Sequence, residues 1–232
     1  EQPNQLFDRS QVLDQLRPPA HAPEFSRVFA ARTCMMAGVG LTGVFLWYLV
    51  RFWVYGKAVV LTSAPLTIPA GFLIAGMAVA TLIGAALASW AAGPISERIE
   101  EKNIPVARVV AGACLLYAAG LALAWGLGVW STGTARENGM LLFALISGFA
   151  FGVYDSLGLE LVMDSLPDPR RAGHDLGIYA LANSAGLALA AIIGALLVNA
   201  FEHSFGYYLL FPSAIVMVLL AGIVTLTTKS AE

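Results

Sequence analysis

Long apolar stretches separated by short polar segments occupy almost all of the chain after Phe25. Each stretch is long enough to cross the hydrocarbon core of a bilayer, which takes about 20 residues in a helix. Strands of a membrane barrel would instead alternate over about 10 residues, so the pattern favours helices. The predicted spans are 28–54, 70–93, 106–130, 139–163, 176–201 and 207–228. We therefore predict an all-α membrane protein with six transmembrane helices.

The segments outside these spans define three parts of the chain. Residues 1–26 are polar and predict a cytoplasmic linker, in which residues 8–17 could form a short amphipathic helix. Residues 27–229 form the predicted six-helix bundle, and residues 230–232 form a tail. The chain begins with Glu1 and not with methionine, so we expect either that its start has been removed or that it is a piece of a longer protein.

The six spans divide into two triplets that are predicted to be inverted relative to one another. Because three is an odd number, the second triplet starts from the opposite face of the membrane. Inverted repeats are the building plan of many secondary transporters. Small residues at four-residue spacing predict close helix packing on the second, fourth and fifth spans, which leaves the third and sixth more exposed to lipid. Examples are Gly84 with Ala88, Gly148 with Gly152, and Gly186 with Ala190.

The distribution of basic residues predicts the orientation. The chain has 13 Lys and Arg residues. Only Arg51, Lys57 and Arg136 fall on the side away from the termini, which leaves ten on the side of the termini. By the positive-inside rule both termini are cytoplasmic. We expect a multi-pass protein of the cell (plasma) membrane, which is the inner membrane in a bacterium.

Composition and motifs exclude several classes of function. The chain is 58% hydrophobic and 12% charged, whereas a soluble domain carries roughly a quarter charged residues. The net charge of -2 suggests no nucleic-acid partner. No metal-binding spacing, phosphate-binding glycine loop or nucleophile elbow is present, so we expect no cofactor, no metal and no enzyme activity. A membrane enzyme that uses His174 and Asp175 would have no motif to support it.

Two carboxylates inside the fourth span require an explanation. Asp155 is predicted to lie roughly 24 Å along the helix from Gly139, in the cytoplasmic third of the membrane. A carboxylate at that depth costs a few kcal/mol unless it is paired, protonated or hydrated. Asp155 is therefore either a proton- or cation-linked group or cavity wall, or a gate carboxylate paired with an arginine. Glu160 lies closer to the headgroups and is a weaker candidate for the same roles.

Further polar side chains in the spans are candidates for a substrate or coupling site. Arg32 lies one turn inside the first span and could extend its guanidinium to the inner surface, pair with a carboxylate of the fourth span, or hold an anionic group of the substrate. Asn183 in the fifth span either bonds a neighbouring helix or faces a cavity. Tyr154 and Tyr179 are possible cavity groups.

The segments that follow the second and fourth spans carry recognisable motifs. Gly93-Pro-Ile-Ser-Glu97-Arg98 resembles the Gly-x-x-x-Asp-Arg loop motif of the major facilitator superfamily, with Glu100 at the position of the second glycine. Asp164-Ser-Leu-Pro-Asp-Pro-Arg170-Arg171 resembles the acidic motif with a distal arginine that sugar porters carry. The run 152–177 is similar to actinobacterial relatives of the glycoside–pentoside–hexuronide:cation symporters.

This resemblance implies a fold and a function. The chain would be the C-terminal six-helix half of a secondary transporter that moves a small, sugar-like solute by alternating access, in symport with an ion. The first and fourth spans would line the cavity, and the second and fifth would face a second six-helix half. That half would be part of the same polypeptide, a separate chain or a second copy, in that order of preference.

The two motifs would also form a cytoplasmic gate. Its members would be Glu97, Arg98, Asp164, Arg170 and Arg171, with Gly93 at its start. The alternative is a non-transporting membrane scaffold or assembly subunit with the same half-transporter fold.

Overall fold

The computed structural model describes residues 23–55, 67–131, 133–166, 172–200 and 203–228, and this part of the chain is almost entirely helical, without a strand. Five helices are long and apolar enough to cross a membrane, and a bent helix pair supplies a sixth span. The prediction of an all-α membrane protein is confirmed. The elements are α2 (Pro23–Gly43), α3 (Leu46–Leu49), the π-helix η1 (Val50–Val54), α4 (Thr67–Lys102), α5 (Val106–Trp130), α6 (Thr134–Asp164), α7 (Ala172–Ala200) and α8 (His203–Leu226).

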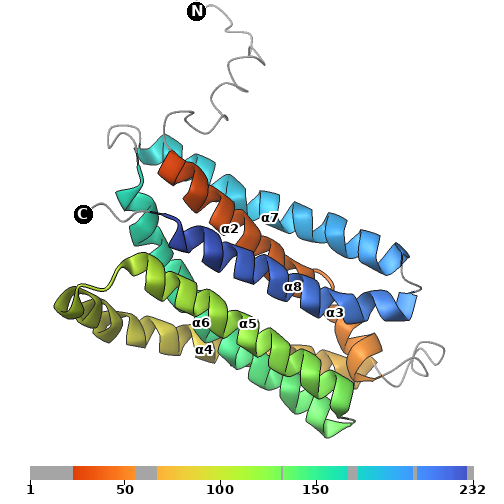
Figure 1. Cartoon of the computed structure of the whole chain (residues 1–232). Coiled ribbons are helices and arrows are strands. Elements are labelled where there is room, and N and C mark those ends of the chain that lie inside the picture. Colours follow the sequence, from red (N-terminus) through yellow and green to blue (C-terminus); the bar gives the residue numbers. More distant parts are fainter. Residues whose placement is uncertain (1–22, 56–66, 132, 167–171, 201–202, 229–232) are drawn as a thin grey trace, which may run out of the picture.

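The helices pack as two groups of three (Figure 1). Helix α2 contacts α7 and α8, helix α6 contacts α4 and α5, and α5 joins α8 between the groups. If the first triplet of spans is exchanged with the second, these main contacts are unchanged: α2 takes the place of α6, α4 that of α7, and α5 that of α8. The contact of α7 with α8 has no equally close counterpart between α4 and α5. The arrangement is the inverted repeat predicted from the number of spans, and it is consistent with half of a transporter fold.

Small residues set the two closest helix crossings. At the crossing of α4 and α6, a methyl group on Gly84 would overlap the Leu145 carbonyl, and one on Gly148 would overlap the Thr81 carbonyl. At the equivalent crossing of α2 and α7, a methyl group on Gly186 would lie 2.7 Å from the Thr33 carbonyl oxygen. Packing in lipid relies on such close backbone approach. The four-residue spacing of small side chains therefore marked packing faces correctly.

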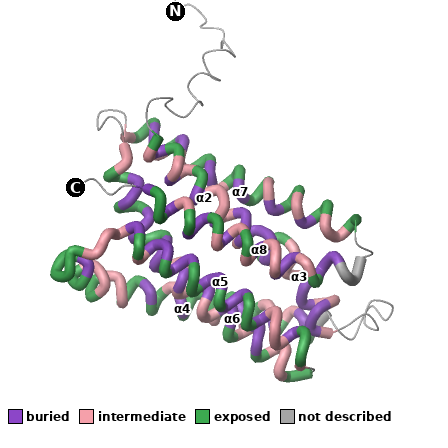
Figure 2. The backbone as a smooth tube through the Cα atoms, in the orientation of Figure 1, coloured by how far each residue is buried: buried purple, intermediate pink, exposed green. Residues whose placement is uncertain are grey.

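The expected burial of the spans is confirmed for α6 but is wrong for α4, α5, α7 and α8 in this chain on its own. Within their most apolar windows, α4 and α7 are only 22% buried, whereas α5 and α6 are 50% buried and α8 is 39% buried. The physical reason is that α4 and α7 each pack one small-residue face on a single main partner and leave the other face open (Figure 2). The open faces carry large apolar side chains, which include Phe72, Leu82 and Trp90 on α4 and Leu181, Ile192 and Leu196 on α7.

The first span is broken, although the sequence predicted one stretch over 28–54. Helix α2 ends at Gly43, and the chain resumes at Leu46 with its axis bent by 46°. Glycine is a poor helix former, and the Phe45 ring that follows fits against Gly194 of α7, where any side chain would overlap it. The outer arm Leu46–Val54 is held by aromatic contacts. The Trp53 ring lies 4.2 Å from that of Tyr208 and 5.5 Å from that of Phe211, centroid to centroid.

Most of the helices extend beyond their predicted ends, and the extensions of α2 and α4 alter the predicted organisation of the chain. Helix α2 starts at Pro23, inside the segment predicted as linker, and residues 1–22 with the predicted amphipathic helix lie outside the described residues. Helix α4 continues past residue 93 and Pro94 to Lys102, so the motif read as a loop is helical. A short connection follows, with Asn103 in a left-handed conformation (φ 48°) that commonly ends helices.

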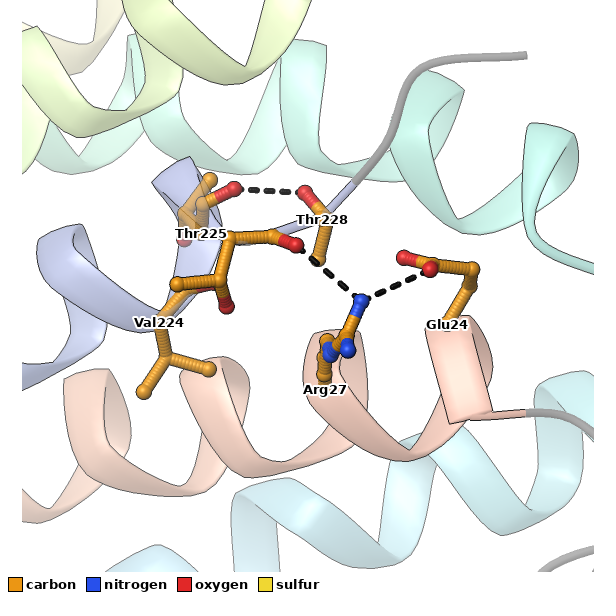
Figure 3. A network of polar contacts seen from close by, with 6 residues as sticks. Glu24, Arg27, Val224, Thr225 and Thr228 are labelled. Carbon is orange, nitrogen blue, oxygen red and sulfur yellow. Dashed lines mark hydrogen bonds and ion pairs between the residues drawn. The ribbon is translucent and has the colours of Figure 1, made fainter.

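Arg27 connects the first and last spans at their ends (Figure 3). Its Nη1 donates to the Thr227 carbonyl at 3.1 Å and pairs with Glu24 at 2.7 Å. The Thr228 hydroxyl donates to the Thr225 carbonyl at 2.5 Å. The last carbonyls of a helix have no partner within the helix. Arg27 and Thr228 together supply partners at the end of α8.

Candidate functional site

A charge pair joins α2 to α6, two helices that otherwise make few contacts with each other. The Arg32 Nη1 lies 2.7 Å from the Asp155 Oδ1. The Arg32 side chain is 9% exposed, whereas that of Asp155 is 55% exposed. Of the alternatives for Arg32, the structure shows the pairing with a carboxylate of the fourth span.

The other neighbours of Arg32 are an amide oxygen and three aromatic rings, which stabilise and enclose its guanidinium. The Arg32 Nε donates to the Asn183 Oδ1 of α7 at 2.8 Å. The guanidinium carbon lies 5.6 Å from the ring centroids of Phe151 and Tyr154 and 5.7 Å from that of Tyr179. Burying a charge is costly unless it is paired and hydrogen-bonded, and each ring contact contributes about 0.5–2 kcal/mol. Three spans therefore meet around one cation.

Five of the six side chains predicted for a substrate or coupling site come together here. Arg32, Asp155, Asn183, Tyr154 and Tyr179 belong to this cluster. Glu160 lies five residues further along α6 and is exposed. Sequence reasoning missed Phe151, although its place one turn before Asp155 puts it on the same helix face.

Asp155 also lines a cavity of about 510 Å³ next to the cluster. Its walls come from α2, α4, α5 and α6. The lining residues are Val39, Thr81, Ala85, Ser89, Tyr117, Ser147, Gly148, Phe151, Gly152, Asp155, Ser156 and Leu159. Ligand sites in proteins typically measure about 300–1,000 Å³. Asp155 therefore connects the buried cation on one side with an open space of ligand size on the other.

The hydroxyl groups of the cavity wall are not singled out by the sequence pattern. Each of the four serine and threonine hydroxyls donates its hydrogen to a carbonyl of its own helix. The acceptors are the carbonyls of Met77 for Thr81 (2.9 Å), Ala85 for Ser89 (3.1 Å), Ala144 for Ser147 (3.0 Å) and Gly152 for Ser156 (2.8 Å). Serine and threonine in helices commonly satisfy themselves in this way.

The predicted cytoplasmic gate is not assembled within the described part of the chain. Glu97 and Arg98 lie on the exposed side of α4, and Asp164 is exposed at the last residue of α6. No ion pair joins either α4 residue to Asp164 among these described side chains. Arg170 and Arg171 lie outside the described residues. Gly93 is exposed within α4, with open space around it.

The start of α7 carries a second acidic group. Asp175 is buried in the first turn, where a negative charge suits the helix dipole, and its Oδ1 lies 3.2 Å from the His174 Nδ1. The His174 side chain is 47% exposed. In the described ranges no group of three His, Cys, Asp or Glu side chains could hold a metal ion.

The element η1 of the first span and the start of α6 are joined by polar contacts. Arg136 donates from Nη1 to the Trp53 carbonyl at 3.0 Å and from Nε to the Ser131 carbonyl at 2.7 Å. Burial and a hydrogen bond to Glu137 raise the pKa of Tyr55 to about 12. The first and fourth spans are thus connected at the Arg32–Asp155 pair and again at the start of α6.

Six apolar spans in two inverted triplets, with a buried charge pair beside a cavity, define a multi-pass membrane protein of the transporter type. The model of the Major Facilitator Superfamily matches residues 70–232, well over half of the chain. The chain belongs to this superfamily of membrane transporters. No curated protein and no solved structure matches it.

Proposed function

We propose that this chain forms one half of an ion-coupled secondary transporter in which Asp155 is the coupling carboxylate. The single observation that carries the proposal is the position of Asp155, with one oxygen on the buried Arg32 and 55% of its side chain exposed at the cavity wall. A group so placed contacts both the protein's internal charge and whatever enters the cavity.

The coupling follows from the charge balance of the pair. While Asp155 is ionised, it holds Arg32 and thereby connects α2 to α6. Proton or cation binding at Asp155 weakens its attraction to Arg32, since the ion pair depends on the carboxylate charge. Only an interaction that differs between two states shifts their populations. Binding of a proton or cation to Asp155 would therefore shift the populations of the states that differ in how α2 and α6 are arranged.

A second six-helix half would complete the cavity. The open apolar faces of α4 and α7, the second and fifth spans, supply the surface on which that half would pack. We rank its origin as before: the same polypeptide, a separate chain, or a second copy. Transport would follow from rocking of the two halves around a site at their interface. The cell membrane as location, cytoplasmic termini, the relation to glycoside–pentoside–hexuronide symporters and symport as the mode are further parts of this proposal.

The polar lining of the cavity supports transport over the scaffold alternative. A scaffold would need only a dry apolar interface with its partners. The cavity instead carries a carboxylate and several hydroxyl groups, and a carboxylate is costly in a membrane protein without a role.

The test is solute accumulation in proteoliposomes that contain the protein with its second half. Asp155→Asn is expected to abolish accumulation against a gradient while exchange of solute across the membrane continues. Glu101→Gln, which neutralises an exposed carboxylate on α4 far from the pair along the chain, is the control and should accumulate solute as the wild type does. Unchanged accumulation by Asp155→Asn removes Asp155 from the coupling mechanism.

A further inference from the structure

We propose that the cavity beside Asp155 binds a protonated amine that carries an apolar body, and not an anion or a polyol. This inference rests on the proposed transport function and specifies its solute class. Because the amine and the coupling ion would compete for Asp155, it replaces symport with exchange of the two as the mode. It differs from the sugar-like solute suggested by the family resemblance, because it follows from the hydrogen-bonding state of the cavity wall.

The serine and threonine hydroxyl groups of the cavity wall can accept hydrogen bonds from a ligand, but their hydrogens are already donated to backbone carbonyls. Thr81, Ser89, Ser147 and Ser156 each donate their one hydroxyl hydrogen to their own helix. A hydroxyl oxygen keeps two acceptor lone pairs after it has donated. The Tyr117 hydroxyl is hydrogen-bonded to Thr42, whose own hydroxyl donates to the Val39 carbonyl at 3.1 Å. A ligand on this wall therefore meets oxygen acceptors.

The charged groups beside the cavity also favour a cationic ligand over an anionic one. The Arg32 side chain is 9% exposed and is not part of the cavity lining, because its Nε is bonded to Asn183, its Nη1 to Asp155, and three rings surround it. Asp155 has its Oδ1 on Arg32, and its side chain is more than half exposed. The cavity therefore presents a carboxylate to a ligand and keeps the guanidinium behind it.

An ammonium group matches this wall better than a hydroxyl group does. An ammonium has three donors and no acceptor, so each of its hydrogens can find an oxygen of Asp155 or of the neighbouring hydroxyls. A sugar hydroxyl also carries acceptor lone pairs, which would find no free donor among these side chains, and an unmet buried polar group is costly. Val39, Ala85, Phe151 and Leu159 supply an apolar lining for the rest of the ligand.

The direct test is binding of two probes of the same shape to the protein reconstituted with its second half. Phenethylamine is protonated at pH 7, and 2-phenylethanol replaces its ammonium with a hydroxyl group. We expect the amine to bind at least tenfold more tightly, as measured by calorimetry in nanodiscs. Equal affinity of the two probes, or tighter binding of phenylacetate, would overturn the inference.

Variants separate a role in binding from a role in folding. Asp155→Asn should lower the affinity for phenethylamine at least tenfold and leave that for 2-phenylethanol unchanged. Ser156→Ala should weaken amine binding about threefold, as expected for the loss of one hydrogen bond. Ser165→Ala is the matched control, since Ser165 also donates to its own helix, at 2.9 Å to Val162, but lies outside the cavity. If Asp155→Asn does not yield a monodisperse protein, Ser156→Ala decides, and equal affinities of Ser156→Ala and Ser165→Ala for the amine contradict the proposal.

A transport screen distinguishes failure of this inference from failure of the proposed function. Proteoliposomes would be offered phenethylamine, glucose and phenylacetate under an imposed proton or sodium gradient. Accumulation of the amine beyond that in protein-free liposomes under the same gradient supports both proposals. Accumulation of glucose or phenylacetate without the amine overturns the solute class and retains ion-coupled transport. Failure to accumulate any of a broad set of amines, sugars and acids contradicts both.

Discussion

Arg27 and Arg136 occupy equivalent places in the two inverted triplets. Arg27 lies near the start of the first span and donates to the Thr227 carbonyl at the end of the sixth. Arg136 lies at the start of the fourth span and donates to the Ser131 carbonyl at the end of the third. Exchange of the triplets converts one contact into the other, although the partners are 200 residues apart in the first case and five in the second. The inverted repeat is therefore seen both in the packing of the helices and in the hydrogen bonds to the carbonyls at their ends.

The first prediction concerns Arg136, which donates hydrogen bonds to the Ser131 and Trp53 carbonyls. Arg136→Ala should destabilise the fold by about 1–3 kcal/mol, because hydrogen bonds from a charged donor are lost at both the Ser131 and Trp53 carbonyls. Arg136→Lys should restore only part of this loss, since an ammonium lacks the planar fork of the guanidinium. The measurement is thermal or denaturant unfolding in detergent.

Arg108→Ala provides the control for this prediction, since Arg108 is exposed on α5. It should leave the unfolding midpoint within the error of the wild type. Equal midpoints for Arg136→Ala and Arg108→Ala would mean that the Arg136 contacts contribute nothing to stability.

The second prediction concerns the crossing of α4 and α6 at Gly148. Gly148→Ala should destabilise the protein by about 1–3 kcal/mol, the usual cost of overpacking, because the new methyl group would meet the Thr81 backbone, which cannot rotate away. The readout is the fraction of monodisperse protein in size-exclusion chromatography, together with the unfolding midpoint.

Gly112→Ala on α5 is the matched control, since nothing lies within 4 Å of the position of its added methyl group. Alanine is a better helix former than glycine, so this variant should be as stable as the wild type or slightly more stable. A Gly148→Ala protein as stable as Gly112→Ala would contradict the close crossing.

The third prediction concerns the cytoplasmic gate, whose described members are apart in this arrangement. If Glu97 and Arg98 meet the charges of the segment after α6 only when the cytoplasmic side closes, Arg98→Glu should favour the open state. The rate at which a maleimide labels Ser156→Cys from the cytoplasmic side should then rise at least twofold. The background carries Cys34→Ala and Cys114→Ala.

Arg108→Glu is the control for the gate, because it makes the same charge change at another exposed arginine of the chain. Its labelling rate should match that of the unmodified background. An unchanged rate in Arg98→Glu would leave the motif residues without a gating role.

Much of the fold and the membership of the site were predictable from the sequence. Asp155, Arg32 and Asn183 stand out because polar groups inside apolar stretches are costly and need partners. Their mutual pairing was only one of several alternatives, since hydropathy fixes the depth of a residue along a span but not the direction in which it faces. Phe151 and the hydroxyl groups of the cavity were missed because aromatic, serine and threonine side chains are common in membrane helices for packing alone.

Other features could not be read from the pattern for physical reasons. The break after Gly43 lies in residues as apolar as their neighbours, and the charged end of α4 at Glu97–Lys102 resembles a loop although it continues a helix. The burial of α4 and α7 was predicted wrongly because lipid is as apolar as a helix surface, so apolar composition does not separate the two environments.

The break in the first span gives its two arms mechanical independence. The inner arm carries Arg32, whereas the outer arm carries Trp53, which is held by Arg136 and by the rings of Tyr208 and Phe211. An elbow between the arms would let the arm that carries Trp53 move without pulling the guanidinium away from its carboxylate. One span can thus respond to events at two depths of the membrane separately.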